Sequence, residues 1–94
     1  MPDPRQDNLG FFFSDTAARV PGRVAIVDLW GGRRRTFTFA DLDRRTSAVG
    51  AFLQSAGAKQ GERIAILVGN RNEYLEAFYG VMRAGLVAVP LNVR

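Results

Sequence analysis

Near the start of the chain, apolar side chains and one threonine recur every three or four positions, which is the spacing of one helix face. The residues in this pattern are Leu9, Phe12, Phe13, Thr16, Ala17 and Val20. The pattern predicts a helix over Leu9–Arg19. Asn8 is a favourable N-cap for it, and the Pro21-Gly22 pair ends it.

The next segment alternates polar and apolar residues with the period of a strand. Arg23–Leu29 and Arg35–Phe39 are the two alternating runs, and Trp30–Arg33 separates them. The Gly-Gly pair inside that separator supplies the positive φ angles of a tight turn. We therefore predict a β-hairpin with Phe37 and Phe39 on one face and the neighbouring threonines on the other.

A second helix is predicted immediately after the hairpin. Thr38 and Asp41 have the spacing of a capping box, and Gly57 has the place of a left-handed residue after the last turn. The stripe expected to be buried is Leu42, Arg45, Thr46, Val49, Phe52, Leu53 and Ala56. This helix should cover the core of the unit.

The last third of the chain has the pattern of a strand, a helix and a strand. Arg63–Val68 is a nearly continuous apolar run, which is typical of a strand buried on both faces. A helix follows, with Asn70 as N-cap and Glu73 at the capping-box position, and it ends at Gly85. Its inward residues should be Tyr74, Leu75, Phe78, Val81 and Met82. With Leu86–Val89 as the closing strand, the segment predicts a βαβ unit.

These elements define an α/β class, in the order helix, β-hairpin, helix and βαβ unit. The chain of 94 residues is long enough for one small domain. We expect residues 1–7 to be a flexible leader and residues 8–94 to form a single unit. No apolar run is long enough for a transmembrane segment. The sequence has no cysteine and no histidine, which excludes disulfides, thiolate metal sites and histidine-based catalysis within it.

Two features allow a functional interpretation beside a structural one. The Gly69-Asn70 turn opens a helix and is able to hold phosphate on backbone amides, but no glycine-rich nucleotide motif accompanies it. Arg33–Arg35, with Arg44 and Arg45, form a basic group, but no nucleic-acid-binding motif is present. We favour a plain capped turn and a solvated charged surface, and we expect no nucleic-acid partner.

The carboxylates also have structural explanations. Asp41 and Glu73 are assigned to helix caps, and Asp43 and Glu76 are expected on solvent-facing helix surfaces near arginines. We assign no catalytic residue, no cofactor-binding residue and no metal ligand within these 94 residues.

Two segments resemble signatures of one enzyme family. Thr36–Leu42 (TFTFADL) is similar to the T-[FY]-x-[DE]-L signature of adenylate-forming enzymes, and Met82–Asn92 (MRAGLVAVPLN) resembles the next signature, [KR]-A-G-x-x-x-x-P-[LI]-[ND]. Three further segments fit in order between and before them: residues 19–27, 57–66 and 70–81. The resemblance covers nearly the whole chain from about Leu9. It implies the N-terminal part of the large domain of such an enzyme, and hence an incomplete AMP-binding domain over residues 8–94.

The resemblance implies an acyl-CoA synthetase as the parent protein, and the lack of cysteine fits a cytoplasmic location. Such enzymes activate a carboxylic acid with Mg·ATP as an acyl-adenylate and then transfer the acyl group to coenzyme A. The family's phosphate loop, magnesium- and ribose-binding residues and catalytic lysine lie later in its chain. The remaining polypeptide is thus an implied partner, ATP, Mg and coenzyme A are implied for the parent alone, and the fragment is expected to be inactive.

Two other interpretations remain open. Pro90-Leu91-Asn92 favours an acyl- or aryl-CoA synthetase, since peptide-synthetase adenylation domains more often carry aspartate at the last of these positions. An amino-acid adenylation domain is therefore the alternative within the family. The alternative from a different class is a stand-alone, non-catalytic binding module.

Overall fold

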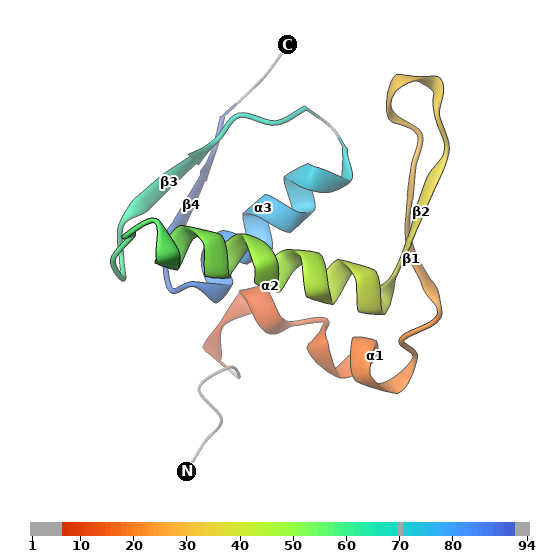
Figure 1. The fold of residues 1–94 in the computed structure, drawn as a ribbon, viewed down its shortest axis with the longest axis horizontal. Helices are drawn as coiled ribbons and strands as arrows, with labels where there is room; N and C mark the ends of the chain where they lie inside the picture. Colours follow the sequence, from red (N-terminus) through yellow and green to blue (C-terminus); the bar gives the residue numbers. More distant parts are fainter. Residues whose placement is uncertain (1–6, 70, 92–94) are drawn as a thin grey trace.

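The computed structural model describes residues 7–69 and 71–91. Figure 1 shows a β-hairpin at one end of a long helix and a pair of parallel strands near its other end. The elements are a 3₁₀ helix (Leu9–Phe11), α1 (Ser14–Arg19), β1 (Val24–Asp28), a second 3₁₀ helix (Trp30–Gly32), β2 (Arg35–Thr38), α2 (Phe39–Ser55), β3 (Arg63–Ile66), α3 (Asn72–Arg83) and β4 (Val87–Pro90). The predicted α/β class and the order of its elements are confirmed.

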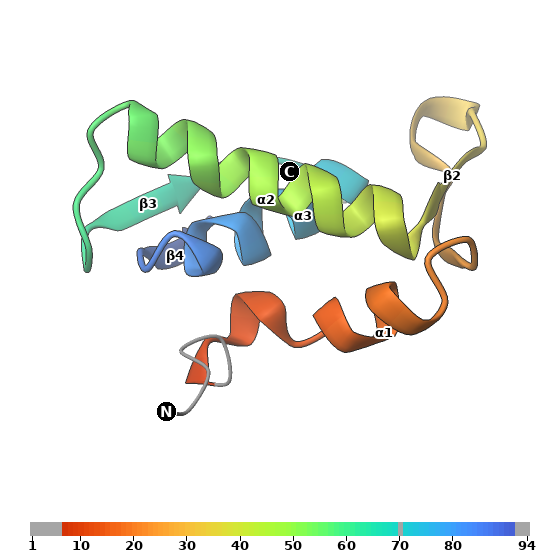
Figure 2. The same cartoon turned by 60° about the horizontal axis from the view of Figure 1, so that its bottom comes forward.

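The predicted first helix is wrong in one respect, because it is divided in two. Asn8 caps the 3₁₀ helix by accepting a hydrogen bond from the N–H of Gly10 at 2.8 Å. Gly10 lies so close to α3 that a Cβ atom on it would be 2.6 Å from the carbonyl oxygen of Tyr79. The chain bends after this contact, and α1 begins only at Ser14. Figure 2 shows this N-terminal segment running along one side of α2 and α3.

The hairpin is confirmed, with antiparallel pairing of β1 and β2 and a register shift between Val24 and Ile26. Its turn contains Gly31 and Gly32 at φ angles of 69° and 74°, the left-handed region that favours glycine. The prediction that Phe37 and Phe39 share a strand face is wrong. The capping box of Thr38 starts α2 at the next residue, so Phe39 belongs to the helix.

Helices α2 and α3 approach each other closely. A Cβ atom on Gly80 would lie 2.6 Å from Cβ of Val49 and 2.8 Å from the carbonyl oxygen of Thr46, so only glycine permits this distance. Leu42 and Thr46 of the predicted α2 stripe are buried as expected. Phe52 is not, because 68% of it is exposed on a part of α2 that no other described element covers.

Strands β3 and β4 pair in parallel with each other and are connected through α3, as the βαβ prediction requires. Ile66, Val81 and Leu86 form the core between the strands and α3. The prediction that the first strand is buried on both faces is wrong: Ile66 is 3% exposed, but Leu67 is 68% exposed. Only one face of this two-stranded sheet is covered by the described elements.

The start of α3 also differs from the prediction. The proposed cap, Asn70, lies outside the described residues. The N-cap position is held by Arg71, whose side chain makes no capping hydrogen bond. Of the residues expected to face inward, Val81 is buried, whereas Leu75 is 37% exposed.

Candidate functional site

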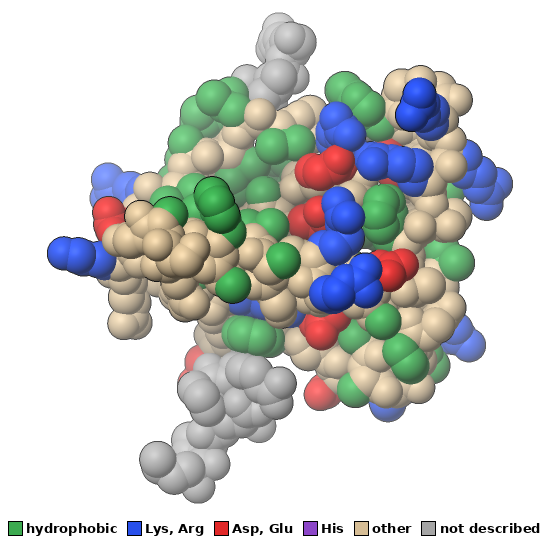
Figure 3. Space-filling view, in the orientation of Figure 1, with side chains coloured by type: hydrophobic (Ala, Val, Ile, Leu, Met, Phe, Trp, Pro, Cys, Tyr) green, Lys and Arg blue, Asp and Glu red, His purple; other side chains and the backbone are tan. Residues whose placement is uncertain are grey.

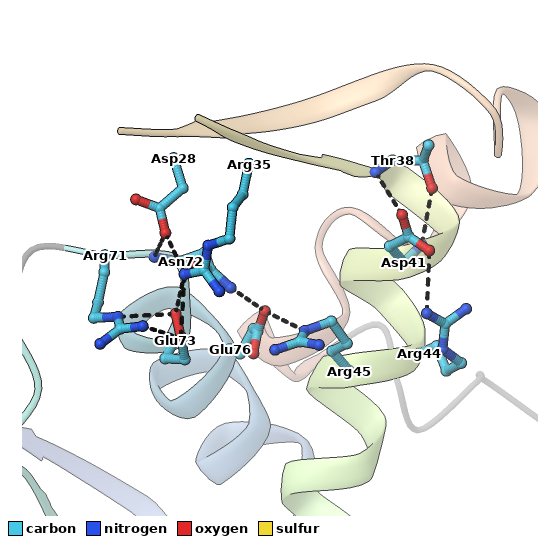
Figure 4. Close-up of polar contacts among 10 residues, drawn as sticks. All are labelled: Asp28, Arg35, Thr38, Asp41, Arg44, Arg45, Arg71, Asn72, Glu73 and Glu76. Atoms are coloured by element: carbon cyan, nitrogen blue, oxygen red, sulfur yellow. Dashed lines mark hydrogen bonds and ion pairs between the residues drawn. The ribbon is translucent and has the colours of Figure 1, made fainter. Parts of the chain in front are cut away.

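Seven polar side chains meet where the hairpin, α2 and α3 join (Figure 4). We call them the junction cluster: Asp28, Arg35, Arg45, Arg71, Asn72, Glu73 and Glu76. Asp28 ends β1, Arg35 begins β2, and Arg45 comes from α2. The other four come from the N-cap and the first turns of α3. The cluster therefore links three elements that are distant in sequence.

Asp28 is the central acceptor of the junction cluster and is 5% exposed. Its Oδ1 accepts the backbone N–H of Trp30 at 2.9 Å, and its Oδ2 accepts Nη2 of Arg35 at 2.8 Å and the backbone N–H of Asn72 at 3.3 Å. The N–H of Trp30 is the largest cause that lowers the pKa of Asp28, and Arg35 and Asn72 add to it against the opposing effect of burial. The carboxylate thus remains ionised while it caps α3.

This cap bears on the phosphate hypothesis for the turn before α3. An anion is favoured at a helix N-terminus, but Asp28 already supplies that anion to the N–H of Asn72. The turn itself faces the ring of Trp30, because a Cβ atom on Gly69 would lie 2.7 Å from that ring. The guanidinium of Arg71 lies 5.8 Å from the centroid of the same ring. The geometry therefore supports the structural interpretation of the turn.

The prediction that Glu76 faces solvent is wrong, because it is 5% exposed. Its Oε2 accepts hydrogen bonds from Nε of Arg45 at 2.7 Å and from Nδ2 of Asn72 at 2.8 Å. Arg45 also lies over the ring of Phe37, 5.1 Å from its centroid. Glu76 faces α2 at the level where α2 presents an arginine. The predicted stripe of α2 included Arg45, but it did not identify Glu76 as the partner of that arginine.

Glu73 is an ion-pair partner and makes no capping box among the described residues. Its Oε2 lies 2.9 Å from Nη2 of Arg71, and its Oε1 lies 3.2 Å from Nη2 of Arg35. Burial acts to raise the pKa of Glu73, but its own backbone N–H and the guanidinium of Arg71 outweigh burial and lower it. Arg35 therefore joins Glu73 to Asp28 and is not a freely solvated charge.

A second polar centre ties the N-terminal segment to the end of α3. The side chain of Arg83 is 4% exposed, and it donates to the carbonyl oxygen of Gly10 at 2.6 Å, to Oδ1 of Asp43 at 2.7 Å and to Oγ of Ser47 at 2.7 Å. Its guanidinium also lies 4.8 Å from the ring centroid of Phe13. Asp43 was expected on a solvent-facing surface near an arginine; its side chain is 38% exposed, and Arg83 is that arginine.

Both polar centres consist mainly of paired charges. Each carboxylate of the junction cluster is paired with a guanidinium. Across residues 7–69 and 71–91, no group of three histidine, cysteine, aspartate or glutamate side chains is placed to hold a metal ion. Of the basic group, Arg35, Arg44 and Arg45 each pair with a carboxylate. The arrangement can hold the hairpin, α2 and α3 together.

One pair in the cluster has a signal in the sequence itself, apart from helix and strand periodicity. Asp28 and Arg35 are directly opposite each other in the hairpin register. Opposite charges at facing strand positions attract each other, so the pair follows from the predicted hairpin. The links to Asn72, Glu73 and Glu76 depend on how α3 packs, and the sequence pattern carries no sign of them.

The AMP-binding enzyme family model matches residues 13–94. Since this match spans most of the chain, the protein belongs to the AMP-binding enzyme family. A long-chain-fatty-acid–CoA ligase of Escherichia coli O157:H7 is 34% identical over 89 residues, which are 94% of this chain and 15% of that protein. A linear gramicidin synthase of Brevibacillus parabrevis is 32% identical over 95% of this chain and 2% of its own length. The chain therefore spans a small part of each relative.

Solved structures agree with this family membership. A fatty acyl CoA synthetase of Mycobacterium tuberculosis superposes with a TM-score of 0.86 and 29% identity, covering 98% of this chain and 18% of that chain. The inhibitor-bound N-terminal domain of FACL13 from the same organism superposes with a TM-score of 0.79 and 30% identity, covering 90% of this chain and 21% of that one. The fold is thus an element of the N-terminal domain of such ligases. Among the described helices, none is long and apolar enough to cross a membrane.

Proposed function

We propose that residues 8–94 are the N-terminal scaffold segment of a cytoplasmic, ATP-dependent acyl-CoA ligase. The parent enzyme would activate a carboxylic acid as its acyl-adenylate and transfer the acyl group to coenzyme A. The observation that carries the proposal is the family match over residues 13–94, together with 34% identity to a long-chain-fatty-acid–CoA ligase. Residues 1–7 would be a leader ahead of this segment.

The segment itself would contribute structure and no chemistry. The signature residues Thr38 and Asp41 are bonded to each other as a capping box, and Gly85 ends α3 at a φ angle of 79°. In support of this, the clustered carboxylates are paired with arginines and the N–H of Asn72 donates to Asp28, so these groups would not be available to Mg·ATP. ATP, Mg and coenzyme A would therefore be held by other parts of the parent protein. We propose no catalytic, cofactor-binding or metal-binding residue in this segment.

Two alternatives are tested against this proposal. An amino-acid adenylation domain is supported by the 32% identity to a linear gramicidin synthase. It would activate an amino acid and pass it to a carrier-protein thiol. A stand-alone binding module would have no ligase activity in any natural protein that carries these residues.

The test compares two proteins: the intact natural protein that carries residues 1–94 and the 94-residue chain alone. ATP–pyrophosphate exchange is measured with a series of fatty acids, aromatic acids and amino acids, followed by thioester formation with coenzyme A. We expect the natural protein to exchange with fatty or aromatic acids and form CoA thioesters, and the chain alone to do neither. Exchange with amino acids only would favour the adenylation domain. No exchange with any acid would refute an adenylate-forming parent.

A further inference from the structure

The turn of the β1–β2 hairpin exposes large apolar side chains beside basic ones. Leu29 is 67% exposed and Trp30 is 48% exposed. Arg33 and Arg34 follow them and are exposed as well. We call these four residues the hairpin tip: Leu29, Trp30, Arg33 and Arg34. The ion pairs of the junction cluster use none of these four side chains, so they give no reason for this composition.

The two arginines of the hairpin tip carry charges that the described structure leaves unpaired. Arg35, the next residue, forms an ion pair with Asp28. Within residues 7–69 and 71–91, Arg33 and Arg34 form no ion pair with a carboxylate. Charge at a hairpin turn is an ordinary protection of a strand edge. That protection does not explain the two exposed apolar side chains beside the arginines.

The hairpin tip is open on its outer side. Figure 1 shows the turn between β1 and β2 at the end of the hairpin that points away from α2. Cβ atoms placed on Gly31 and Gly32 would have no neighbouring atom within 4 Å. Figure 3 shows basic side chains at the outer margin of the same end of the molecule. The turn is therefore accessible to a large surface.

The ring of Trp30 is held in place although about half of the residue is exposed. A Cβ atom on Gly69 would lie 2.7 Å from Cη2 of the ring. The guanidinium of Arg71 lies 5.8 Å from the ring centroid, and the backbone N–H of Trp30 donates to Asp28. The indole thus has a fixed position before any partner binds, so binding would not have to order it.

The chemistry of the hairpin tip is complementary to an anionic lipid surface. Indole rings favour the boundary between water and hydrocarbon, because they combine an apolar body with a polar N–H. Arginines near an anionic bilayer add electrostatic attraction. Each contribution is weak for so few residues, but burial of apolar side chains and attraction of charges together give reversible attachment.

Two other occupants fit the hairpin tip less well. A second copy of the chain, related by a two-fold axis, would bring the unpaired arginines of both copies together. A nucleic acid would need a broader basic surface. Arg44 and Arg45 of the basic group are paired with carboxylates and do not extend that surface.

We infer that the hairpin tip attaches the protein reversibly to an anionic lipid bilayer. Leu29 and Trp30 enter the boundary between headgroups and acyl chains, and Arg33 and Arg34 contact lipid phosphates. Such attachment needs no spanning helix, and none is found among the described helices. The inference does not rest on the proposed function, because it uses only side chains at the turn.

Vesicle co-sedimentation of the intact natural protein is the first test. One set of vesicles is phosphatidylcholine alone, and the other contains equal parts of phosphatidylcholine and phosphatidylserine. We expect binding to the second set to be at least about 10-fold stronger, and to weaken as salt is added. No binding to the anionic vesicles, or equal binding to both sets, overturns the inference.

Variants separate the hairpin tip from the general charge of the protein. Arg33→Gln/Arg34→Gln removes two charges at the turn, and the matched control Arg19→Gln/Arg23→Gln removes two exposed charges ahead of β1. We expect the first to weaken binding to the anionic vesicles about 10–30-fold and the control to weaken it less than about 3-fold. Leu29→Gln should weaken binding at least about 3-fold without a change of charge. Equal losses in the two double variants, or no loss in Leu29→Gln, contradict the assigned contact.

Tryptophan fluorescence reports the contact at one side chain. Trp30 is the only tryptophan in the 94 residues, and Trp30→Phe removes its signal. Anionic vesicles with brominated acyl chains quench a tryptophan that lies near those chains. We expect the unsubstituted natural protein to lose a larger fraction of its fluorescence than Trp30→Phe does. Equal fractional quenching of the two proteins would show that Trp30 does not enter the bilayer.

The outcomes separate this inference from the proposed function and from the other occupants. Acid activation by a protein that binds no vesicles leaves the ligase and removes the lipid contact. Vesicle binding through the hairpin tip in a protein without acid activation refutes the ligase and leaves the contact. Binding of a random DNA duplex that depends on Arg33 and Arg34, without binding of vesicles, would identify a nucleic-acid contact and overturn the inference.

Discussion

The hairpin end of the molecule and the βαβ end differ in the contacts that hold their strands. At the hairpin end, Arg35 donates to Asp28, and Asp28 also accepts the backbone N–H of Asn72, so the two strands are tied to the start of α3. At the other end, β3 and β4 cover α3 with one face and leave Leu67 and Val87 exposed on the other side, by 68% and 46%. Figure 3 shows the contrast, with paired blue and red side chains over the hairpin side and green ones over the strands.

The difference follows from the two kinds of sheet. An antiparallel hairpin tolerates water on one face, whereas parallel strands are normally covered on both. The hairpin end is therefore tied to α3 by paired charges, although Val24, Val27, Leu29 and Trp30 remain exposed there, whereas the βαβ end is held by its apolar core and leaves Leu67 and Val87 exposed. One short chain can thus contain a region joined mainly by charged contacts and a region joined mainly by apolar packing.

The largest expected loss of stability comes from the buried core of the βαβ end. Leu86→Ala should lower the free energy of unfolding of the chain by about 2–5 kcal/mol, because Leu86 is buried between the strands and α3. The matched control Leu67→Ala, at a residue that is 68% exposed, should change it by less than about 0.5 kcal/mol. Urea unfolding measures both. A control as costly as Leu86→Ala would mean that the outer face is already covered.

The next largest expected effect concerns the junction cluster. Glu76→Gln should cost about 1–3 kcal/mol, because Arg45 loses its charged partner at a buried contact. Glu62→Gln, at an exposed turn, is the matched control and should stay within about 0.5 kcal/mol, because the glutamine oxygen can still accept the N–H of Lys59 as the carboxylate does. Urea unfolding again serves as the measurement. If the two variants are equal, the junction cluster is not what stabilises the hairpin end.

A smaller loss is expected where the hairpin passes into α2. Thr38→Ala removes the side chain that accepts the N–H of Asp41 at 3.1 Å, and loss of such a cap costs about 1 kcal/mol. Thr36→Ala, on the same strand and exposed, keeps the cap and should be nearly neutral. Circular dichroism should show less helix in Thr38→Ala than in Thr36→Ala, and the urea midpoint should be lower in the same variant. A greater loss in the control would place the start of α2 elsewhere.

The smallest expected effect is a loss of folding stability at acidic pH. The pKa of Asp28 is lowered chiefly by the N–H of Trp30, below an ordinary value of 3.8. The folded state therefore binds fewer protons than the unfolded state, so its stabilisation is complete above pH 3.8 and is lost as pH falls through the lower folded value. Asp28→Asn should flatten this part of the stability curve, which unfolding measured between about pH 2 and pH 5 would record.

The control for the acid dependence is Asp15→Asn, at an exposed position of α1. It should retain the acid-dependent loss of the unsubstituted chain. Asp41 and Glu73, whose pKa values are also lowered, should preserve a residual dependence in Asp28→Asn. A curve that Asp28→Asn leaves unchanged would contradict the role of this carboxylate.

Local signals in the sequence were sufficient for the elements themselves. Thr38 with Asp41, Gly31 with Gly32, and the apolar run from Arg63 each specify an element through neighbours in the chain, and the structure has a cap, a turn and a strand there, although that strand is buried on one face only. The division of the first helix at Gly10 was not predictable in this way, because it arises from contact with α3, more than 60 residues away.

The polar cluster was predicted least well, and for the same reason. Glu76 and Asp43 look like surface carboxylates when each helix is considered alone. Their partners, Arg45 and Arg83, come from the facing helix in each case. Packing angles decide such pairs, and the alternation of polar and apolar residues does not encode them.

The contact between Arg83 and Gly10 has a consequence for synthesis. The carbonyl oxygen of Gly10 receives its donor from a residue 73 positions later, and Asn8 donates to Met82 across a similar separation. During translation, the first dozen residues therefore emerge long before their binding surface exists. They can form these contacts only after the last turn of α3 has left the ribosome. Docking of the amino terminus is therefore a late event in folding.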